Sequence, residues 1–261
     1  MAALINVPSK AKRGEIIEIR TLTPHHGRCS GGTRYHHELQ LPLQRHRDLP
    51  RRPVSGDRCQ SLFVLLHGSH GERQVRVRMD RRQRLFVGRV AARYPAFDKA
   101  LGRPVTLDQR INLCRTDQQQ ASPLPYESRD ILALSAFVAH QSRGIAITAG
   151  DDPQLKRFVE QGRNLFRQRE GQLNLSCANC HDDNFDKHLA GSPITQAQPT
   201  GYPLYRLEWQ SLASLERRLR SRMTGVRAQA YEYGAPELVA LELYLMSRAR
   251  GMPMETPAVR P

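Results

Sequence analysis

The spacing of apolar residues divides the chain into an early part with strand-like alternation and a later part with helical periodicity. Apolar and charged residues alternate over residues 14–22, as expected for a half-buried strand, and residues 62–66 and 75–79 are candidates for two further strands. Residues 25–60 show no convincing period. The first third of the chain is therefore expected to contain only a partial β module.

From residue 91 onward the apolar positions favour helices. Asp152 before Pro153 is typical of a capping side chain followed by proline at the first helical position. The apolar face of that helix is formed by six residues: Leu155, Phe158, Val159, Gly162, Leu165 and Phe166. Gly162 in the middle of this face indicates a close helix–helix crossing, with a merely tolerated glycine as the alternative. A second apolar helix is expected to begin at Pro236 and to end near Gly251.

The helical part also contains an internal repeat. Residues 131–145 align with residues 238–252, and residues 106–111 align with residues 214–219, with offsets that differ by one residue. Chance similarity between amphipathic helices is the alternative explanation. The alignment predicts two tandem helical units.

A pentapeptide in the second unit carries specific chemistry. Residues 177–181 read Cys-Ala-Asn-Cys-His, the CxxCH attachment site of c-type haem. The thiols of Cys177 and Cys180 can form thioethers to the two vinyl groups of one porphyrin, and His181 then lies under the iron as its proximal ligand. Zinc is the main alternative, but a zinc site needs a second pair of ligands. The remaining cysteines offer no second CxxC: Cys29, Cys59 and Cys114. We expect one covalently bound haem c.

Charge is distributed unevenly along the chain. Residues 1–90 carry +11 of the net charge of +15. The Arg-rich segment 44–58 has the charge of a nucleic-acid binder, but it is interrupted by proline and lacks aromatic residues on which bases could stack. We expect a poorly ordered basic segment and no nucleic-acid partner. No run of residues approaches the length of an apolar membrane span.

The beginning of the chain does not resemble a signal peptide. Residues 2–7 are too short for its hydrophobic region, and the basic residues 10–13 follow directly. Because haem is normally attached to CxxCH outside the cytoplasm, the motif predicts a periplasmic protein. We therefore expect that the natural N-terminus differs from the one in this sequence.

Segments distributed over residues 91–261 carry a family resemblance. They are residues 93–95, 101–103, 109–116, 171–184, 189–192, 199–203, 205–210, 233–237 and 248–261. Together they resemble SoxA, the cytochrome c subunit of the SoxAX thiosulfate-oxidising complex. The resemblance implies a mainly α, cytochrome c-like fold and a periplasmic L-cysteine S-thiosulfotransferase. Such an enzyme couples thiosulfate oxidatively to a cysteine of SoxY in the SoxYZ carrier and passes electrons through haem to its heterodimer partner, the SoxX cytochrome.

The resemblance also assigns roles in the second unit. Arg218 would bind the sulfonate end of thiosulfate, for which the forked donors of guanidinium are suited. Four residues later the family has a catalytic, iron-ligating cysteine, but this chain has Arg222. Guanidinium cannot act as a sulfur nucleophile and is a poor iron ligand. Met223 is the nearest soft donor for the distal position. Its alternative role is to continue the apolar face of Leu215 and Leu219.

The substitution at Arg222 leaves two readings of function. The first is a thiosulfate-oxidising enzyme whose activity is put in doubt by the missing cysteine. The second is a non-catalytic c-type electron-transfer protein. A third reading, a SoxZ-like binding module, would need a complete β sandwich, which the sequence does not support.

In the first unit, Arg110 and Cys114 correspond to Arg218 and Arg222. The resemblance places Cys114 where some members ligate a second haem and others form a disulfide. We recognise no upstream partner and expect a free thiol. The first unit also has no CxxCH of its own, because residues 69–73 read Ser-His-Gly-Glu-Arg.

The resemblance of the early residues completes the predicted organisation. Residues 1–24 resemble the start of the carrier subunit SoxZ, and we hypothesise that the basic segment 25–90 includes a shifted reading frame joined to a truncated SoxA sequence. Residues 91–150 would be a remnant of the first cytochrome c-like unit, and residues 151–261 the haem-binding domain.

Overall fold

The computed structural model describes residues 4–6, 17–22, 63–67, 74–78, 90–189 and 191–260. The chain forms two compact units, one of residues 1–11 and 16–77 and the other of residues 12–15 and 78–261. The Arg-rich segment 44–58 lies outside the described residues, and of the longer segment 25–90 only residues 63–67, 74–78 and 90 are described.

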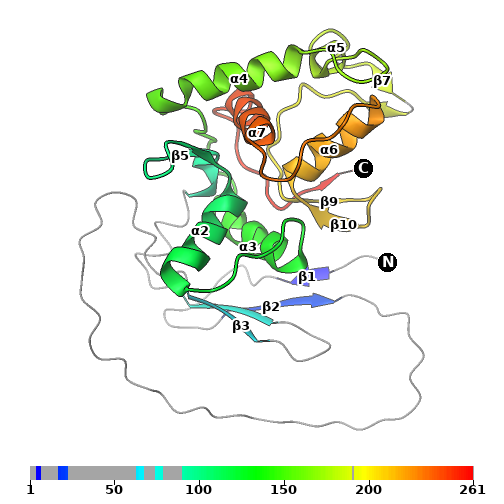
Figure 1. Ribbon diagram of the computed structural model, residues 1–261. Coiled ribbons are helices and arrows are strands. Elements are labelled where there is room, and N and C mark those ends of the chain that lie inside the picture. Colours follow the sequence, from blue (N-terminus) through cyan, green and yellow to red (C-terminus); the bar gives the residue numbers. More distant parts are fainter. Residues whose placement is uncertain are drawn as a thin grey trace, which may run out of the picture. The chain divides into compact units, whose positions relative to one another are not determined.

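The unit of residues 1–11 and 16–77, called the β unit, contributes strands of one sheet to the described residues (Figure 1). They are β1 (Leu4–Asn6), β2 (Ile17–Leu22), β3 (Phe63–His67) and β4 (Gln74–Arg78), in the order β1-β2-β4-β3. β2 is antiparallel to both β1 and β4, and Ile19 pairs with Val75. The three strands expected from alternation are confirmed.

The unit of residues 12–15 and 78–261, called the helical unit, is mainly helical, which confirms the expected fold class. Its helices are η1 (Ala91–Arg93), α2 (Leu107–Gln119), α3 (Arg129–His140), η2 (Pro153–Leu155), α4 (Lys156–Arg167), α5 (Cys177–His181), α6 (Leu215–Gly225) and α7 (Pro236–Arg248). Its strands are β5 (Ala96–Asp98), β6 (Arg103–Val105), β7 (His188–Leu189), β8 (Ser192–Pro193), β9 (Leu204–Arg206), β10 (Ser211–Ala213) and β11 (Val259–Arg260). Within the described ranges, no helix combines the length and apolar character needed to cross a bilayer.

The internal repeat is visible in the order of the elements. A two-stranded antiparallel pairing followed by a helix occurs twice, as β5-β6-α2 and as β9-β10-α6. Both helices begin with a hydroxyl cap: Thr106 accepts from the backbone N–H of Gln109, and Ser214 accepts from that of Arg217. α3 and α7 then follow at corresponding places. The repeat predicted from residues 106–145 is therefore a feature of the fold.

α4 packs across α7 (Figure 1), and the sequence of α4 explains why the helices approach so closely. The turn η2 begins as predicted, with the Asp152 carboxylate accepting from Gln154 N at 2.9 Å. Gly162 lies at the crossing, where an added Cβ would be 2.0 Å from the carbonyl oxygen of Ala240 and 2.7 Å from Cβ of Tyr244. Of the two readings of Gly162, the close crossing is confirmed.

Gly162→Ala should destabilise the domain by about 1–3 kcal/mol, because a methyl group at the crossing would push backbone against backbone. Unfolding of the haem-containing protein by urea measures the effect. Gly225→Ala is the matched control: Gly225 also lies in a helix, but an added Cβ would have no atom within 4 Å. Alanine at 225 should be neutral or slightly stabilising. Equal midpoints for wild type and Gly162→Ala would contradict the packing argument.

Candidate haem site

The CxxCH residues form the short helix α5, which is fixed by a reciprocal cap. Ser176 Oγ accepts from Asn179 N at 3.3 Å, and Asn179 Oδ1 accepts from Ser176 N at 3.0 Å. This capping box satisfies two N–H groups that a five-residue helix would otherwise leave unpaired. Cys177, Cys180 and His181 are thus presented from one rigid turn.

The loop before α5 is held against the end of α6. Gly171 has φ +68°, and a Cβ there would lie 2.2 Å from the carbonyl oxygen of Val226. The N–H of Leu173 donates to the same oxygen at 3.4 Å. Glycine is therefore required for the close approach that connects the CxxCH loop to α6.

The two cysteines are free thiols and partly buried. Burial, assisted by the nearby charge of Glu170, raises the pKa of Cys177 to about 11. A zinc ion would bind these two cysteines as thiolates and would need a further pair of ligands. In the part of the chain that the structure describes, no group of three or more His, Cys, Asp or Glu side chains is arranged to hold a metal ion. The arrangement fits thioether attachment better than a zinc site.

The imidazole of His181 is oriented by one backbone oxygen. Its Nδ1 lies 2.6 Å from the carbonyl oxygen of Thr195 and donates to it, which leaves Nε2 for iron. Burial lowers the pKa of His181, and the positive charges of Arg222, Arg248 and Arg218 lower it further against the opposing effect of the Thr195 carbonyl. His181 is therefore held as the neutral imidazole that metals bind.

Arginines from α6 and β9 gather beside the CxxCH turn. Burial, and then the charge of Arg222, lower the pKa of Arg218 to about 10. Burial and the charge of Arg206 lower the pKa of Arg222. The guanidinium groups of Arg218 and Arg222 make no hydrogen bond or ion pair with described residues, whereas Arg206 donates to Glu208 through Nε at 2.7 Å. The cluster of Arg206, Arg218 and Arg222 therefore keeps an excess of positive charge beside His181.

Comparison with the first repeat shows how this excess arises. Arg110, the counterpart of Arg218, forms an ion pair with Asp98 on β5. The position equivalent to Asp98 on β9 is occupied by Arg206. An internal ion pair in the first repeat is thus replaced by two like charges in the second. Sequence reasoning missed Arg206, although extending the repeat alignment upstream to position 98 would have found it.

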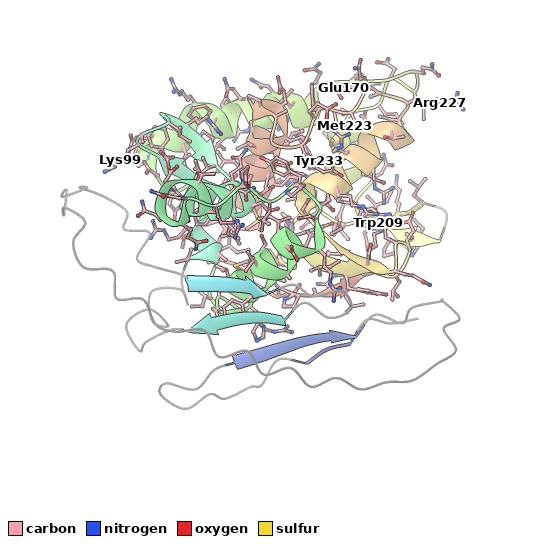
Figure 2. All side chains as sticks on the ribbon, turned by 60° about the horizontal axis from the view of Figure 1, so that its bottom comes forward. Lys99, Glu170, Trp209, Met223, Arg227 and Tyr233 are labelled. Carbon is pink, nitrogen blue, oxygen red and sulfur yellow. The ribbon has the colours of Figure 1, made fainter. Side chains whose placement is uncertain are left out.

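Met223 (labelled in Figure 2) lies in the core. It is buried in one cluster with Phe166, Leu215 and Leu219, and Cys177 packs against the same cluster from its edge. The alternative reading of Met223, as the continuation of the apolar face of α6, is therefore supported. Distal ligation by Met223 stays a prediction.

The expectation of a free thiol at Cys114 is wrong. Cys114 is disulfide-bonded, and its partner is not among the described residues. Cys177 and Cys180 are the free cysteines of the described part.

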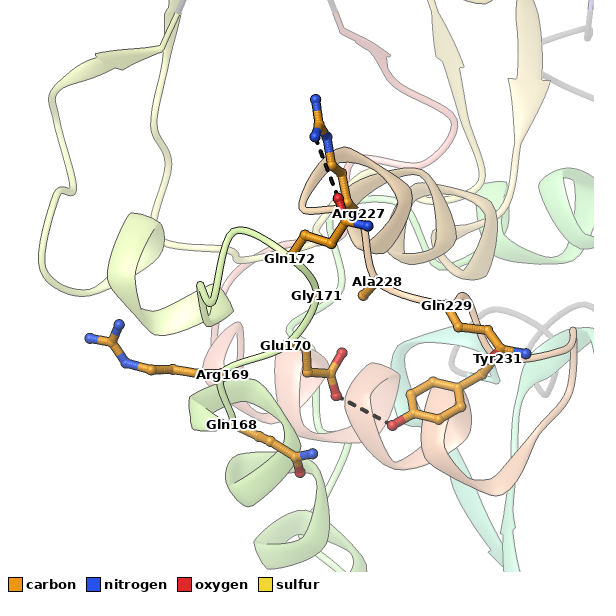
Figure 3. A pocket seen from close by; sticks show the side chains of 9 residues that line it. All are labelled: Gln168, Arg169, Glu170, Gly171, Gln172, Arg227, Ala228, Gln229 and Tyr231. Carbon is orange, nitrogen blue, oxygen red and sulfur yellow. Dashed lines mark hydrogen bonds between the residues drawn. The ribbon is translucent and has the colours of Figure 1, made fainter.

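A shallow groove of about 560 Å³ lies beside the Gly171 loop (Figure 3). It is lined by Gln168, Arg169, Glu170, Gly171, Gln172, Arg227, Ala228, Gln229 and Tyr231. The Tyr231 hydroxyl donates to Glu170 across it at 3.4 Å. None of the CxxCH residues and none of the clustered arginines line this groove, although its Glu170 lies near enough to Cys177 to raise the pKa of that thiol.

Comparison with known proteins places the helical unit in a family. Residues 80–147 and 161–254 match the family model described as SoxA/TsdA, cytochrome c domain. The chain is 35% identical over 172 residues to the L-cysteine S-thiosulfotransferase subunit SoxA of Pseudaminobacter salicylatoxidans, covering 66% of this chain and 60% of the relative. It is 37% identical over 167 residues to the SoxA subunit of Rhodovulum sulfidophilum, covering 64% and 58%. The chain thus spans about three fifths of the length of these curated relatives.

A solved structure agrees with these relatives. The crystal structure of SoxXA from P. pantotrophus contains a chain that matches with a TM-score of 0.64 and 29% identity over 66% of this chain and 65% of that chain. A cytochrome c domain implies covalently bound haem c, which the CxxCH turn, the oriented His181 and the two free thiols fit. The chain belongs to the SoxA/TsdA cytochrome c domain family.

Proposed function

We propose that this protein is a c-type cytochrome of periplasmic sulfur oxidation, carrying one haem on Cys177 and Cys180 with His181 as proximal ligand. It would couple thiosulfate to a cysteine of SoxY in the SoxYZ carrier and pass the electrons to SoxX. A sulfur–sulfur bond forms between the carrier thiol and the terminal sulfur of thiosulfate. The thiol proton and two electrons are released, and a haem held by Cys177, Cys180 and His181 would supply the one-electron acceptor chemistry on the way to SoxX.

The observation that carries this proposal is the guanidinium of Arg218 beside the CxxCH turn, which has no hydrogen-bond or ion-pair partner in the part of the chain that the structure describes. Its lowered pKa reflects burial and the neighbouring charge of Arg222, so an anion would relieve an unfavourable electrostatic arrangement. Thiosulfate carries two negative charges and a sulfonate end that accepts forked hydrogen bonds. Arg206 and Arg222 add to the attraction.

Arg222 supports the competing function, electron transfer without thiosulfate turnover. The cluster holds charge but, with arginine at this position, no sulfur nucleophile. The haem protein mixed with thiosulfate, SoxYZ and SoxX distinguishes the two functions. Reduced c-type absorbance bands that require both thiosulfate and the carrier would support the enzyme. A haem that stays oxidised with thiosulfate but accepts electrons from a chemical reductant would support electron transfer.

Arg222→Cys should raise thiosulfate-dependent turnover from a low or absent level to a measurable one, because it supplies a thiol one helical turn after Arg218. Turnover per haem is measured with SoxYZ and an electron acceptor. Ser221→Cys is the matched control, since it adds a thiol to an exposed neighbouring position of α6. Equal turnover in Arg222→Cys and wild type, at normal haem content, would count against the site assignment.

A further inference from the structure

We propose that Arg248, at the C-terminal end of α7, is a positioning residue that sets the orientation and basicity of the haem ligand His181. The proposal rests on haem attachment at the CxxCH turn. It does not depend on thiosulfate turnover.

Arg248 joins the two segments between which the imidazole is held. Its Nη2 donates to Asp182 Oδ1 at 2.7 Å and to the carbonyl oxygen of Gln196 at 3.0 Å. Asp182 directly follows His181, and Gln196 directly follows Thr195, whose carbonyl accepts from Nδ1 of His181. One nitrogen of Arg248 therefore ties together both ends of the hydrogen bond that orients the ligand.

The guanidinium of Arg248 is itself held in place. It lies over the ring of Phe166, 4.9 Å from its centroid, and its Nη1 donates to the Tyr244 hydroxyl at 3.3 Å. Phe166 in turn lies 6.3 Å from the ring of His181. α4 and α7 thus fix Arg248 from one side, while its two donated bonds fix the CxxCH turn and the Thr195 segment from the other.

Arg250, just after the end of α7, forms an exposed ion pair with which the Arg248 pair can be compared. Arg250 pairs with Asp151 at 2.5 Å, and the two side chains are 55% and 50% exposed. The side chains of Arg248 and Asp182 are only 21% and 31% exposed. The Arg248 pair is less screened and has additional partners, so its loss should move the attached segments, whereas loss of the Arg250 pair should not.

The expected consequence follows from the chemistry of a metal-bound imidazole. A hydrogen bond from Nδ1 to a carbonyl increases electron donation from Nε2 and restricts rotation of the ring. If the Thr195 segment loosens, donation to iron weakens and the oxidised state loses stabilisation. The reduction potential of the haem should then rise, and the orientation of the imidazole should change.

The test uses charge-neutral double variants of the haem protein. Arg248→Gln with Asp182→Asn removes the pair without changing the net charge, so a direct electrostatic shift in potential is minimised. Arg250→Gln with Asp151→Asn is the matched control. We expect a higher reduction potential in spectroelectrochemical titration, and altered g-values in electron paramagnetic resonance, for the first double variant alone. Values equal to wild type in the first double variant, or equal shifts in both, would overturn the proposal.

A milder variant covers the case in which the double variant does not mature with haem. Arg248→Lys keeps the charge but loses the planar fork and the stacking on Phe166. The same shift in potential and g-values, in smaller degree, is expected for Arg248→Lys. Wild-type values in this variant would overturn the proposal. Because neither readout involves thiosulfate or the carrier, a negative result here is distinct from failure of the proposed function.

Discussion

Replacement of both Cys177 and Cys180 by alanine is expected to abolish covalent haem binding. The two thiols are the groups on the CxxCH turn that can form thioethers, and both are free in the structure. The chain is matured in a periplasm that attaches haem, denatured, separated by electrophoresis and stained for haem. We expect no haem signal at the mass of this chain.

The single replacements provide the control for this experiment. Cys177→Ala and Cys180→Ala each leave one thiol and should retain some haem through a single thioether. Because the gel is read on unfolded chains, the result does not depend on whether the variant keeps its native structure. A haem band of wild-type intensity in the double variant would refute attachment at this turn and, with it, the proposed function.

Local patterns were sufficient to predict much of the haem-binding unit. Asp152 and Pro153 mark the start of a helix by their own chemistry, and Gly162 stands where two helices leave no room for a side chain. The repeat could be recognised in the sequence because each copy keeps a hydroxyl cap, Thr106 or Ser214, at the same place before its helix. The caps and the helices that they begin lie within a few residues of one another, whereas Gly162 meets Ala240 of a distant helix and is recognised from its place on the apolar face.

Features that depend on distant partners could not be predicted in this way. The disulfide bond of Cys114 was not predicted, and Arg248 reaches Asp182 from another helix. The charge excess at Arg218 depends on Arg206 lying on the neighbouring strand. These contacts join side chains on separate elements, whose packing a periodic pattern does not specify. The SoxZ-like reading of residues 1–24 and the shifted-frame hypothesis stay predictions.

We expect stability to decline from weakly acidic to neutral pH, because the buried Glu216 and the half-buried Asp108 and Glu242 lie where the repeats meet. Asp108 on α2, Glu216 on α6 and Glu242 on α7 line one small cavity of about 60 Å³. Asp108 accepts from the Ser135 hydroxyl, and one oxygen of Glu216 accepts from Gly234 N at 2.8 Å. The other oxygen, Oε1 of Glu216, is buried without a hydrogen-bond partner among the described residues.

Burial raises the pKa of all three groups, to about 6 for Asp108, to about 7 for Glu216 and well above the usual value for Glu242. The charges of Asp108 and Glu127 raise the pKa of Glu216 further, whereas the hydrogen bond from Gly234 N and then the charge of Arg220 lower it. The charges of Glu216 and Asp108 likewise raise the pKa of Glu242. In the unfolded chain these groups titrate near pH 4. Between about pH 4 and about pH 7 the folded state therefore binds more protons than the unfolded state. The free energy of unfolding must fall as the pH rises through this window.

Glu216→Gln should remove a large part of this pH dependence. Glutamine can still accept from Gly234 N but carries no charge into the cavity, so the variant avoids a penalty of about 3 kcal/mol that Glu216 incurs above its folded pKa. The free energy of unfolding of the haem protein is measured in urea from pH 5 to pH 8, with the exposed Glu232→Gln as control. Wild type and control should lose stability with rising pH, while Glu216→Gln should change less and become the most stable of the three at pH 8. Parallel curves for all three proteins would show that Glu216 is not held protonated between the repeats.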